Sequence, residues 1–181
     1  LNRVVGMGYA VPGSVIAVGV LIPLTRLDNW LAQVWTAVSG SNPGLILTGG
    51  IAALVYAYLA RFLAVALQTV DSSLGKITPS MDDASRSLGY GKWATLARVH
   101  VPMLRGSLLT AGLLVFVDVM KELPATLVIR PFNFDTLATQ AHTLAADERL
   151  AEASTAALII VAVGLLPMIV ISRQILAARR R

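Results

Sequence analysis

Cysteine is absent from the 181 residues, and charged residues make up only 14% of them. Without cysteine the chain has no disulfide and no thiolate metal site. The shortage of charge argues against a soluble globular domain, because such domains carry about 25% charged residues. Hydrophobic residues make up 56% of the whole chain, which predicts a protein whose surface faces lipid.

Signatures of catalysis are also missing. There is no Gly-rich phosphate loop of the Walker type, so we expect no nucleotide hydrolysis by this chain itself. No Ser-His-Asp, paired-acid or zinc-protease pattern occurs, and His100 and His142 have no partner at metal-ligand spacing. We therefore predict no catalytic residue, no metal site and no cofactor in this chain.

Long apolar runs are the main feature that is present. A helix that crosses a bilayer needs about 20 mostly apolar residues. Four stretches approach this length, namely residues 9–24, 45–67, 106–129 and 155–176. The first is short, and the second is interrupted by Arg61. The sequence predicts an all-α fold, a polytopic transmembrane helical bundle with about four spans.

Basic residues are distributed unevenly between the segments that join these spans. Five lie in the loop 68–105 and four in the segment 173–181, whereas the loops of the opposite side hold three. The positive-inside rule places the loop 68–105 and the C-terminus in the cytoplasm, together with Arg3. This topology accounts for the net charge of +5, and we predict no nucleic-acid partner.

The loop 68–105 has helix signals of its own. Thr78 and Pro79 resemble a helix start, with a capping hydroxyl followed by proline at the first helical position. We expect a short helix over residues 80–88 with Gly89 as its C-terminal cap, and a second over 92–99 that ends before Pro102. Such a pair forms either an ordinary solvated loop or a docking surface.

A spaced motif runs through both short helices. It reads Asp83-Ala84-Ser85, three residues, Gly89, nine residues, Val99, one residue, Val101-Pro102. This pattern resembles the cytoplasmic motif of binding-protein-dependent ABC importer permeases: Glu-Ala-Ala, three residues, Gly, nine residues, Ile, one residue, Leu-Pro. The spacing agrees throughout, and the departures are Asp for Glu, Ser for the second Ala, and Val for both Ile and Leu.

The resemblance implies the type I ABC importer permease fold and a bacterial inner-membrane location. It implies that the loop forms coupling helices that dock on an ABC ATPase subunit, which binds ATP and Mg²⁺. The residues to which this docking role carries over are Asp83, Ala84, Ser85, Gly89, Val99, Val101 and Pro102. The chain would then be a transport subunit and not an enzyme.

Two further stretches, YAVPGSVIAVG from Tyr9 and the segment 118–154, resemble the C-terminal half of ferric iron importer permeases. The resemblance implies that residues 1–181 are a partial permease domain, the C-terminal module of a longer permease. It implies a second permease half, in the same polypeptide or as a homodimer, and a periplasmic substrate-binding protein. The implied substrate is ferric iron; thiamine, polyamine, phosphonate and sulfate permeases are the alternatives within this class.

Charged residues and a proline occur inside the third predicted span. They are Asp118, Lys121, Glu122 and Pro124. A charge at the bilayer centre costs about 2.5–3.5 kcal/mol on insertion scales, so such residues normally face a bundle interior or a water-filled path. We expect Asp118 to pair with Lys121, which leaves one excess negative charge, and we expect Pro124 to kink the helix.

Two interpretations of this cluster remain open. The charges line a translocation pathway or gate, suited to a hard cation that prefers oxygen ligands, or they pair with another span and hold the bundle together. A substitution of Glu122 by Gln separates them, because only the first predicts slower uptake with assembly intact. No metal site is predicted here.

Two other classes of protein use intramembrane charges. A membrane-embedded enzyme would use Asp118 and Glu122 as an acid–base pair, but it needs a nucleophile or metal that the sequence does not supply. A channel or secondary transporter would have no reason for the cytoplasmic motif. Co-purification with an ATPase distinguishes an importer permease from both.

Other residues are predicted to serve the fold or its outer surface. We expect interfacial anchors at Trp30, Trp35 and Trp93. Close helix packing is expected at Gly13, Gly19, Gly49 and Gly50. Four acidic residues are expected outside, as solvated loop charges or where a binding protein docks: Asp135, Asp147, Glu148 and Glu152.

Overall fold

The computed structural model describes residues 9–179, with side chains up to residue 173. Every regular element in this range is helical, which confirms the predicted all-α class. The elements are α2 Gly13–Ser39, α3 Ala52–Leu74, α4 Pro79–Ser87, α5 Lys92–Thr95, the π-helical segment η1 Leu96–His100, α6 Val101–Met120, α7 Pro124–Ile129, α8 Leu137–Ala146 and α9 Leu150–Arg179.

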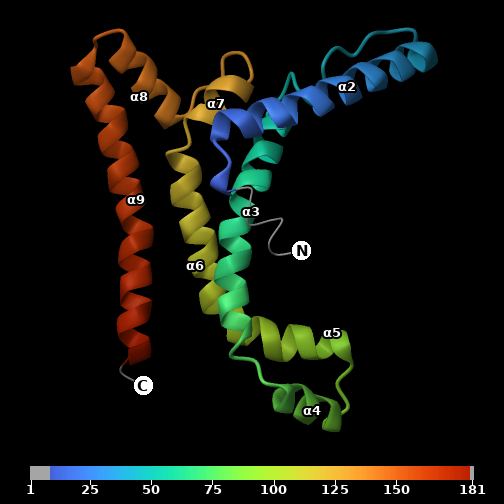
Figure 1. The fold of residues 1–181 in the computed structure, drawn as a ribbon, viewed down its shortest axis with the longest axis vertical. Helices are drawn as coiled ribbons and strands as arrows, with labels where there is room; N and C mark the ends of the chain where they lie inside the picture. Colours follow the sequence, from blue (N-terminus) through green and yellow to red (C-terminus); the bar gives the residue numbers. More distant parts are fainter. Residues whose placement is uncertain (1–8, 180–181) are drawn as a thin grey trace.

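Three long helices, α3, α6 and α9, run side by side, as Figure 1 shows. The short helices α4 and α5 project from one end of this group, and α7 and α8 lie at the other end. Helix α2 lies crosswise at the α7 end, where it contacts α3 and α7. The loop that carries the motif and the loop between α7 and α8 are therefore at opposite ends of the molecule.

Four helices of the described part are long and apolar enough to cross a membrane: Gly13–Ser39, Ala52–Leu74, Lys92–Met120 and Leu150–Arg173. This confirms the predicted number of spans, although the boundaries differ. The first was expected to end at residue 24, but it continues to Ser39 because the polar residues that follow do not stop it. In particular, Asp28 is fully buried and hydrogen-bonded in this helix.

The third predicted span, 106–129, is wrong at both ends. Helix α6 ends at Met120, and Pro124 is the first residue of the separate helix α7, not a kink inside one long helix. Proline suits this first position because its missing N–H needs no partner there. Lys121 and Glu122 consequently lie in the turn between two helices, and only Asp118 of the three charged residues lies within α6.

The third membrane helix also begins earlier than the predicted residue 106. The second short helix does not end before Pro102; α5 passes through the π-helical segment directly into α6. The chain bends at this junction, so that α5 lies across the end of α6 (Figure 1). A π turn next to a proline is a recognised cause of such a bend, because the proline nitrogen cannot donate to the preceding turn.

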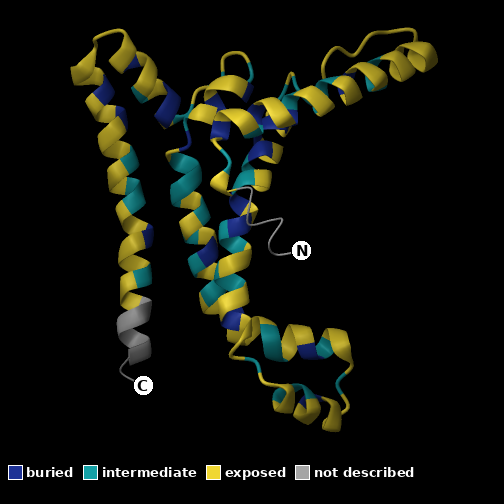
Figure 2. Cartoon of the chain, in the orientation of Figure 1, coloured by how far each residue is buried: buried dark blue, intermediate teal, exposed yellow. Residues whose placement is uncertain are grey.

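Alanines and branched aliphatic residues fill the core where α2, α3 and α7 meet. The buried members are Ala17, Val20, Ala53, Leu54, Ala57, Ala125 and Ile129. Elsewhere the long helices are largely exposed, as Figure 2 shows for α2 and α9. Many of the exposed side chains are large and apolar. In α9, Leu158 and Val161 are examples. Helices with apolar surfaces of this extent are stable in lipid, and the protein is an integral membrane protein.

Only some of the basic residues that supported the predicted orientation lie within the described part of the chain. Arg3, Arg180 and Arg181 lie outside the described residues. The five basic residues of the loop 68–105 all lie within them. The end that carries α4 and α5 is also the end at which the described part of α9 finishes (Figure 1).

Candidate functional site

Helix α4 carries the first part of the motif. Pro79 is its first residue, and Thr78 before it is extended. The Thr78 hydroxyl lies 2.8 Å from the Ser80 hydroxyl and makes no bond to a backbone N–H, so the predicted side-chain cap is wrong. Gly89, with φ of 79°, reverses the chain after the helix, and its N–H donates to the Arg86 carbonyl at 2.9 Å. This left-handed conformation favours glycine and confirms the predicted end of the helix.

Two polar contacts fasten α4 to the helical segment that follows it. The hydroxyls of Ser85 and Thr95 lie 2.6 Å apart, and both residues are buried. Nearer the membrane helices, Nε2 of His100 lies 2.7 Å from Oδ1 of Asp82. Neither contact was predicted from the sequence, in which His100 has no partner at metal-ligand spacing. The two short helices therefore form one unit, which we call the coupling unit, residues 79–100.

The motif residues divide by exposure within this unit. Ser85 faces α5 and is buried, whereas Asp83, Ala84 and Gly89 are exposed. Further along, Val99 is half-buried, and Val101 and Pro102 are exposed. Two apolar residues beside the glycine turn are also strongly exposed, Leu88 at 74% and Trp93 at 83%. A protein that docks on the coupling unit would therefore meet a partly apolar surface.

A second group of polar residues lies near the other end of the molecule. Nζ of Lys121 is 2.9 Å from Oδ1 of Asp118, as the spacing predicted. Glu122 is buried, and its Oε2 lies 3.2 Å from Nε of Arg61 on α3. The predicted excess negative charge is therefore wrong, because Arg61 balances Glu122. The presence of a lone arginine in an apolar span was the signal for this partner, since such a residue needs a counter-ion.

The Arg61–Glu122 pair connects four segments of the chain. Nη1 of Arg61 donates to the Val11 carbonyl at 3.1 Å, just before α2. Oε1 of Glu122 accepts from the Ala125 N–H at 3.1 Å, in the first turn of α7. The pair therefore holds the start of α2, α3, the end of α6 and the start of α7 together.

A glycine makes this arrangement possible. A Cβ atom on Gly13 would lie 2.5 Å from Oε1 of Glu122 and 2.9 Å from Nη1 of Arg61. The predicted close packing is therefore confirmed at Gly13. At Gly19, by contrast, a Cβ would meet nothing within 4 Å, so the prediction is wrong there.

Hydroxyl groups extend the connection between α3 and α7. The Tyr58 and Thr126 hydroxyl oxygens lie 2.5 Å apart, and Thr126 donates to the Glu122 carbonyl at 2.7 Å. Thr126 is completely buried. Within the described part of the chain, no three His, Cys, Asp or Glu side chains are grouped closely enough to hold a metal ion.

Asp28 is a further buried residue, and its contacts were not predicted from the sequence. Its carboxylate accepts hydrogen bonds from the backbone N–H groups of Ile46, Leu47 and Thr48 and from the Thr48 hydroxyl, at 2.7–3.1 Å. It ties the chain that follows α2 back onto that helix. The partners are about 20 residues away, and no periodicity in the sequence indicates them.

Comparisons with known proteins support the resemblance drawn from the motif. The chain is 24% identical over 173 residues to "Fe(3+)-transport system permease protein FbpB 2" of Haemophilus influenzae, covering 96% of this chain and 31% of that protein. It is 29% identical over 109 residues to "Ferric transport system permease protein FbpB" of Actinobacillus pleuropneumoniae, covering 60% and 16%. It is also 24% identical over 173 residues to "Putative 2-aminoethylphosphonate transport system permease protein PhnV" of Salmonella typhimurium, covering 96% and 59%.

The chain thus spans less than two thirds of the length of each of these relatives. No protein-family profile matches it, and no solved structure matches it. The predicted similarity to importer permeases is confirmed by these transport-system permeases. Ferric and phosphonate systems are both represented at the same 24% identity, so the cargo is not decided by similarity.

Proposed function

We propose that this chain is part of the permease of an ATP-driven importer, and that the coupling unit docks on the ATPase subunit that powers it. The observation that carries the proposal is the position of the motif. It lies on a paired-helix unit that projects from one end of the membrane helices, in a chain similar to transport-system permeases (Figure 1). An ATPase subunit would bind ATP and Mg²⁺, and a soluble binding protein would deliver the cargo.

The orientation belongs to the same proposal. The coupling unit and the C-terminus lie on the cytoplasmic side, because the basic residues concentrate there. The absence of cysteine makes a test direct, since a cysteine introduced at Trp93 or at Phe132 is unique in these 181 residues. A thiol reagent that does not cross the membrane is expected to label position 132 in intact cells and to label position 93 only after lysis. The reverse pattern would overturn the orientation.

The contacts within the coupling unit give it a mechanical role. The hydroxyl contact of Ser85 with Thr95 and the Asp82–His100 contact keep α4 and α5 from separating when a partner moves them. Docking contacts then come from the exposed residues, among them Asp83, Ala84 and Gly89. Movement of the ATPase subunits would reach the membrane helices through this unit, in the manner of other domain-closure transitions.

Asp118 and Lys121 are our candidates for the translocation pathway or gate. Lys121 is 62% exposed and lies where α6 ends, so its ion pair with Asp118 can open without disturbing the core. Glu122 and Pro124 instead hold the turn between α6 and α7 in position, because Glu122 is paired with Arg61 and Pro124 begins α7. Both carboxylates are balanced by a basic side chain, so the cluster itself does not favour a cationic cargo over an anionic one.

We propose ferric iron as the cargo, on the resemblance of the segment 118–154 to ferric importer permeases. A phosphonate is the second candidate, because the chain is also 24% identical to a 2-aminoethylphosphonate permease over an alignment of the same length, 173 residues. The test is uptake into vesicles that contain the complete permease and its ATPase, supplied with labelled ferric iron or labelled 2-aminoethylphosphonate and the corresponding binding protein.

Two glycine variants make this test specific to the coupling unit. Gly89 has φ of 79° and Gly91 does not have a positive φ, while a Cβ at either position would meet no atom within 4 Å. Gly89→Ala is therefore expected to reduce uptake and ATPase co-purification, and Gly91→Ala to leave both near the parent values. Uptake of labelled ferric iron by the parent permease would support ferric iron as the cargo. Phosphonate uptake alone would overturn the cargo and keep the importer, and absence of any ATPase partner would overturn the importer.

A further inference from the structure

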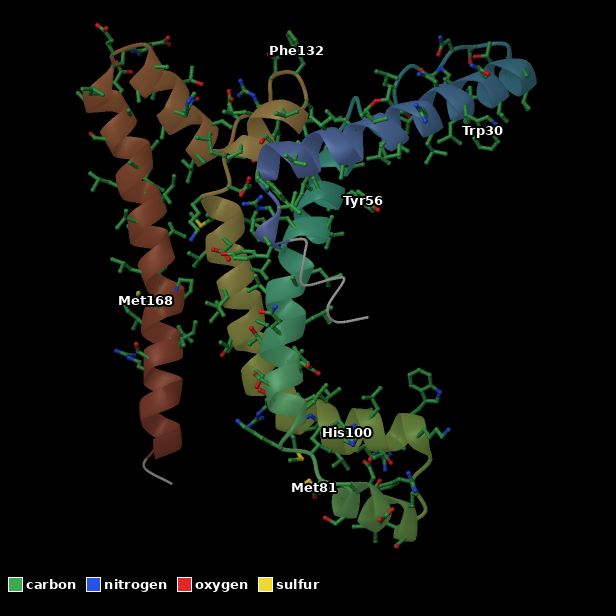
Figure 3. The ribbon with its side chains drawn as sticks, viewed as in Figure 1. Trp30, Tyr56, Met81, His100, Phe132 and Met168 are labelled. Carbon is green, nitrogen blue, oxygen red and sulfur yellow. The ribbon has the colours of Figure 1, made fainter. Side chains whose placement is uncertain are left out.

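The loop between α7 and α8, residues 130–136, carries the most exposed large apolar side chain of the described residues. Phe132 is 99% exposed at its tip. Figure 3 shows this side chain pointing away from the helices, at the end of the molecule opposite to the coupling unit. A ring in this position contributes nothing to the packing of the chain itself.

The loop is nevertheless held in a fixed shape. A salt bridge between Arg130 and Asp135 closes its base, and the Phe134 N–H donates to the Pro131 carbonyl at 3.2 Å. Asn133 adopts a left-handed conformation with φ of 59°, and Phe134 packs against the core of α2, α3 and α7. Phe132 is therefore presented on a preformed turn, so that a partner does not have to order it.

The direction of Phe132 argues against lipid as its surroundings. The side chain points along the line of α3 and α6 and beyond their ends, whereas lipid surrounds these helices laterally (Figure 3). Beside it lies an open cavity of about 340 Å³, which is lined by Leu127, Arg130, Phe134 and other residues of the loop. A projecting aromatic ring next to a notch is a shape suited to the surface of another protein, because anchor residues of interfaces are often aromatic.

The charges of this end indicate the chemistry of that surface. Arg130 pairs with Asp135, and Arg149 pairs with Glu152. Asp147 and Glu148, in the turn between α8 and α9, form no salt bridge with the described residues. This end therefore keeps an acidic excess, and a complementary surface has an apolar socket with a basic rim.

We propose that Phe132 and the cavity beside it form the anchor that seats the soluble substrate-binding protein of the importer. The proposal rests on the proposed function, which supplies the need for such a partner on this side. The ring fills an apolar socket of the binding protein, a side chain of the partner enters the cavity, and Asp147 and Glu148 steer the approach of its basic rim.

The test is a titration of the cargo-loaded binding protein against the assembled permease–ATPase complex in lipid nanodiscs. Phe132→Ala is expected to weaken binding by about 10-fold or more, as for an aromatic anchor. Phe132→Tyr keeps the ring and is expected to bind within a few-fold of the parent. Trp30→Ala is the matched control, because it removes an exposed aromatic side chain from α2, and it should leave the affinity unchanged.

The outcomes separate this proposal from the proposed function. If the parent complex binds no binding protein at all, the part of the proposed function in which a binding protein delivers the cargo fails. If the parent binds it and Phe132→Ala binds equally well, only the anchor is overturned. The anchor is also overturned if Phe132→Ala abolishes association between permease copies, or lipid retention, while binding-protein affinity persists. Basal ATPase activity and gel filtration establish that each variant is assembled.

Discussion

Nε of Arg61 lies 3.2 Å from Oε2 of Glu122, so a residue in the middle of α3 neutralises a residue in the turn between α6 and α7. Glu122 is only 6% exposed, and its other oxygen accepts the Ala125 N–H. This contact favours a structural role for Glu122, which the sequence alone left open beside a role in the pathway.

Breaking this pair is expected to destabilise the protein. Arg61→Ala leaves a buried carboxylate without its counter-ion, at a cost of about 3–5 kcal/mol. Exchange of the two residues, Arg61→Glu with Glu122→Arg, should recover part of the loss. Thermal unfolding in detergent measures both. An exchange variant no more stable than the single variants would contradict the pairing.

The substitution Glu122→Gln distinguishes a structural role of Glu122 from a role in the translocation pathway. The amide oxygen can still accept the Ala125 N–H, so we expect moderate destabilisation from the lost charge and uptake that follows the amount of folded complex. Comparison of uptake with the quantity of assembled protein is the measurement. Uptake that falls while unfolding temperature and assembly stay at parent values would restore the pathway role for this residue.

Gly13→Ala is expected to destabilise the protein by about 1–3 kcal/mol, because its Cβ would crowd Glu122, Arg61 and the Ala125 nitrogen. Gly19→Ala lies in the same helix, where a Cβ meets nothing within 4 Å, and should be neutral or stabilising by about 0.5–1 kcal/mol. The unfolding temperatures of the two variants, compared with that of the parent, measure both effects. Equal effects of the two substitutions would show that Gly13 is not held by its neighbours.

The hydroxyl contact between Ser85 and Thr95 is expected to show strong coupling in a double-mutant cycle. Ser85→Ala leaves the buried Thr95 hydroxyl without its partner and should cost about 1–3 kcal/mol, and Thr95→Val should cost a similar amount. The double variant should be nearly neutral, because both polar groups are gone. Hydrogen exchange of α4 amides measures the stability of the coupling unit. Additive effects of the two substitutions would contradict the contact.

Asp28→Ala is expected to release the chain between α2 and α3. It leaves the N–H groups of Ile46, Leu47 and Thr48 without their acceptor. Limited proteolysis should then cut residues 40–50 faster than in the parent. Asp71→Ala is a control at another acidic position in a long helix. Equal cleavage rates in the parent and Asp28→Ala would show that the segment is held by other contacts.

The number of membrane helices could be predicted from sequence because long apolar runs have few alternatives in lipid. Their ends could not, and Pro124 illustrates the reason. Proline is compatible both with a kink inside a helix and with the first position of a new one. The buried Glu122 side chain, which accepts from the first turn of α7, distinguishes the two, and it depends on tertiary contacts.

The first helix of the coupling unit, α4, was predicted because local signals specify it, with Pro79 at its start and Gly89 after its end. The side of α4 that faces α5 was not predictable in the same way. Ser85 belongs to a motif associated with docking, yet its partner Thr95 is ten residues away across a turn. The pairing of Asp82 with His100 spans 18 residues and follows only from the folded arrangement.

The bend near Pro102 divides a continuous helical path into two arms, a short arm that includes α5 and a long arm formed by α6. The backbone remains helical from Lys92 to Met120, so a displacement of the short arm is not lost in a flexible connector. The long arm has 20 residues, or about 30 Å, and a tilt of about 5° would therefore move its far end by about 3 Å. That far end carries Asp118 and its partner Lys121, so a small push at the coupling unit becomes a larger displacement of this ion pair as a whole.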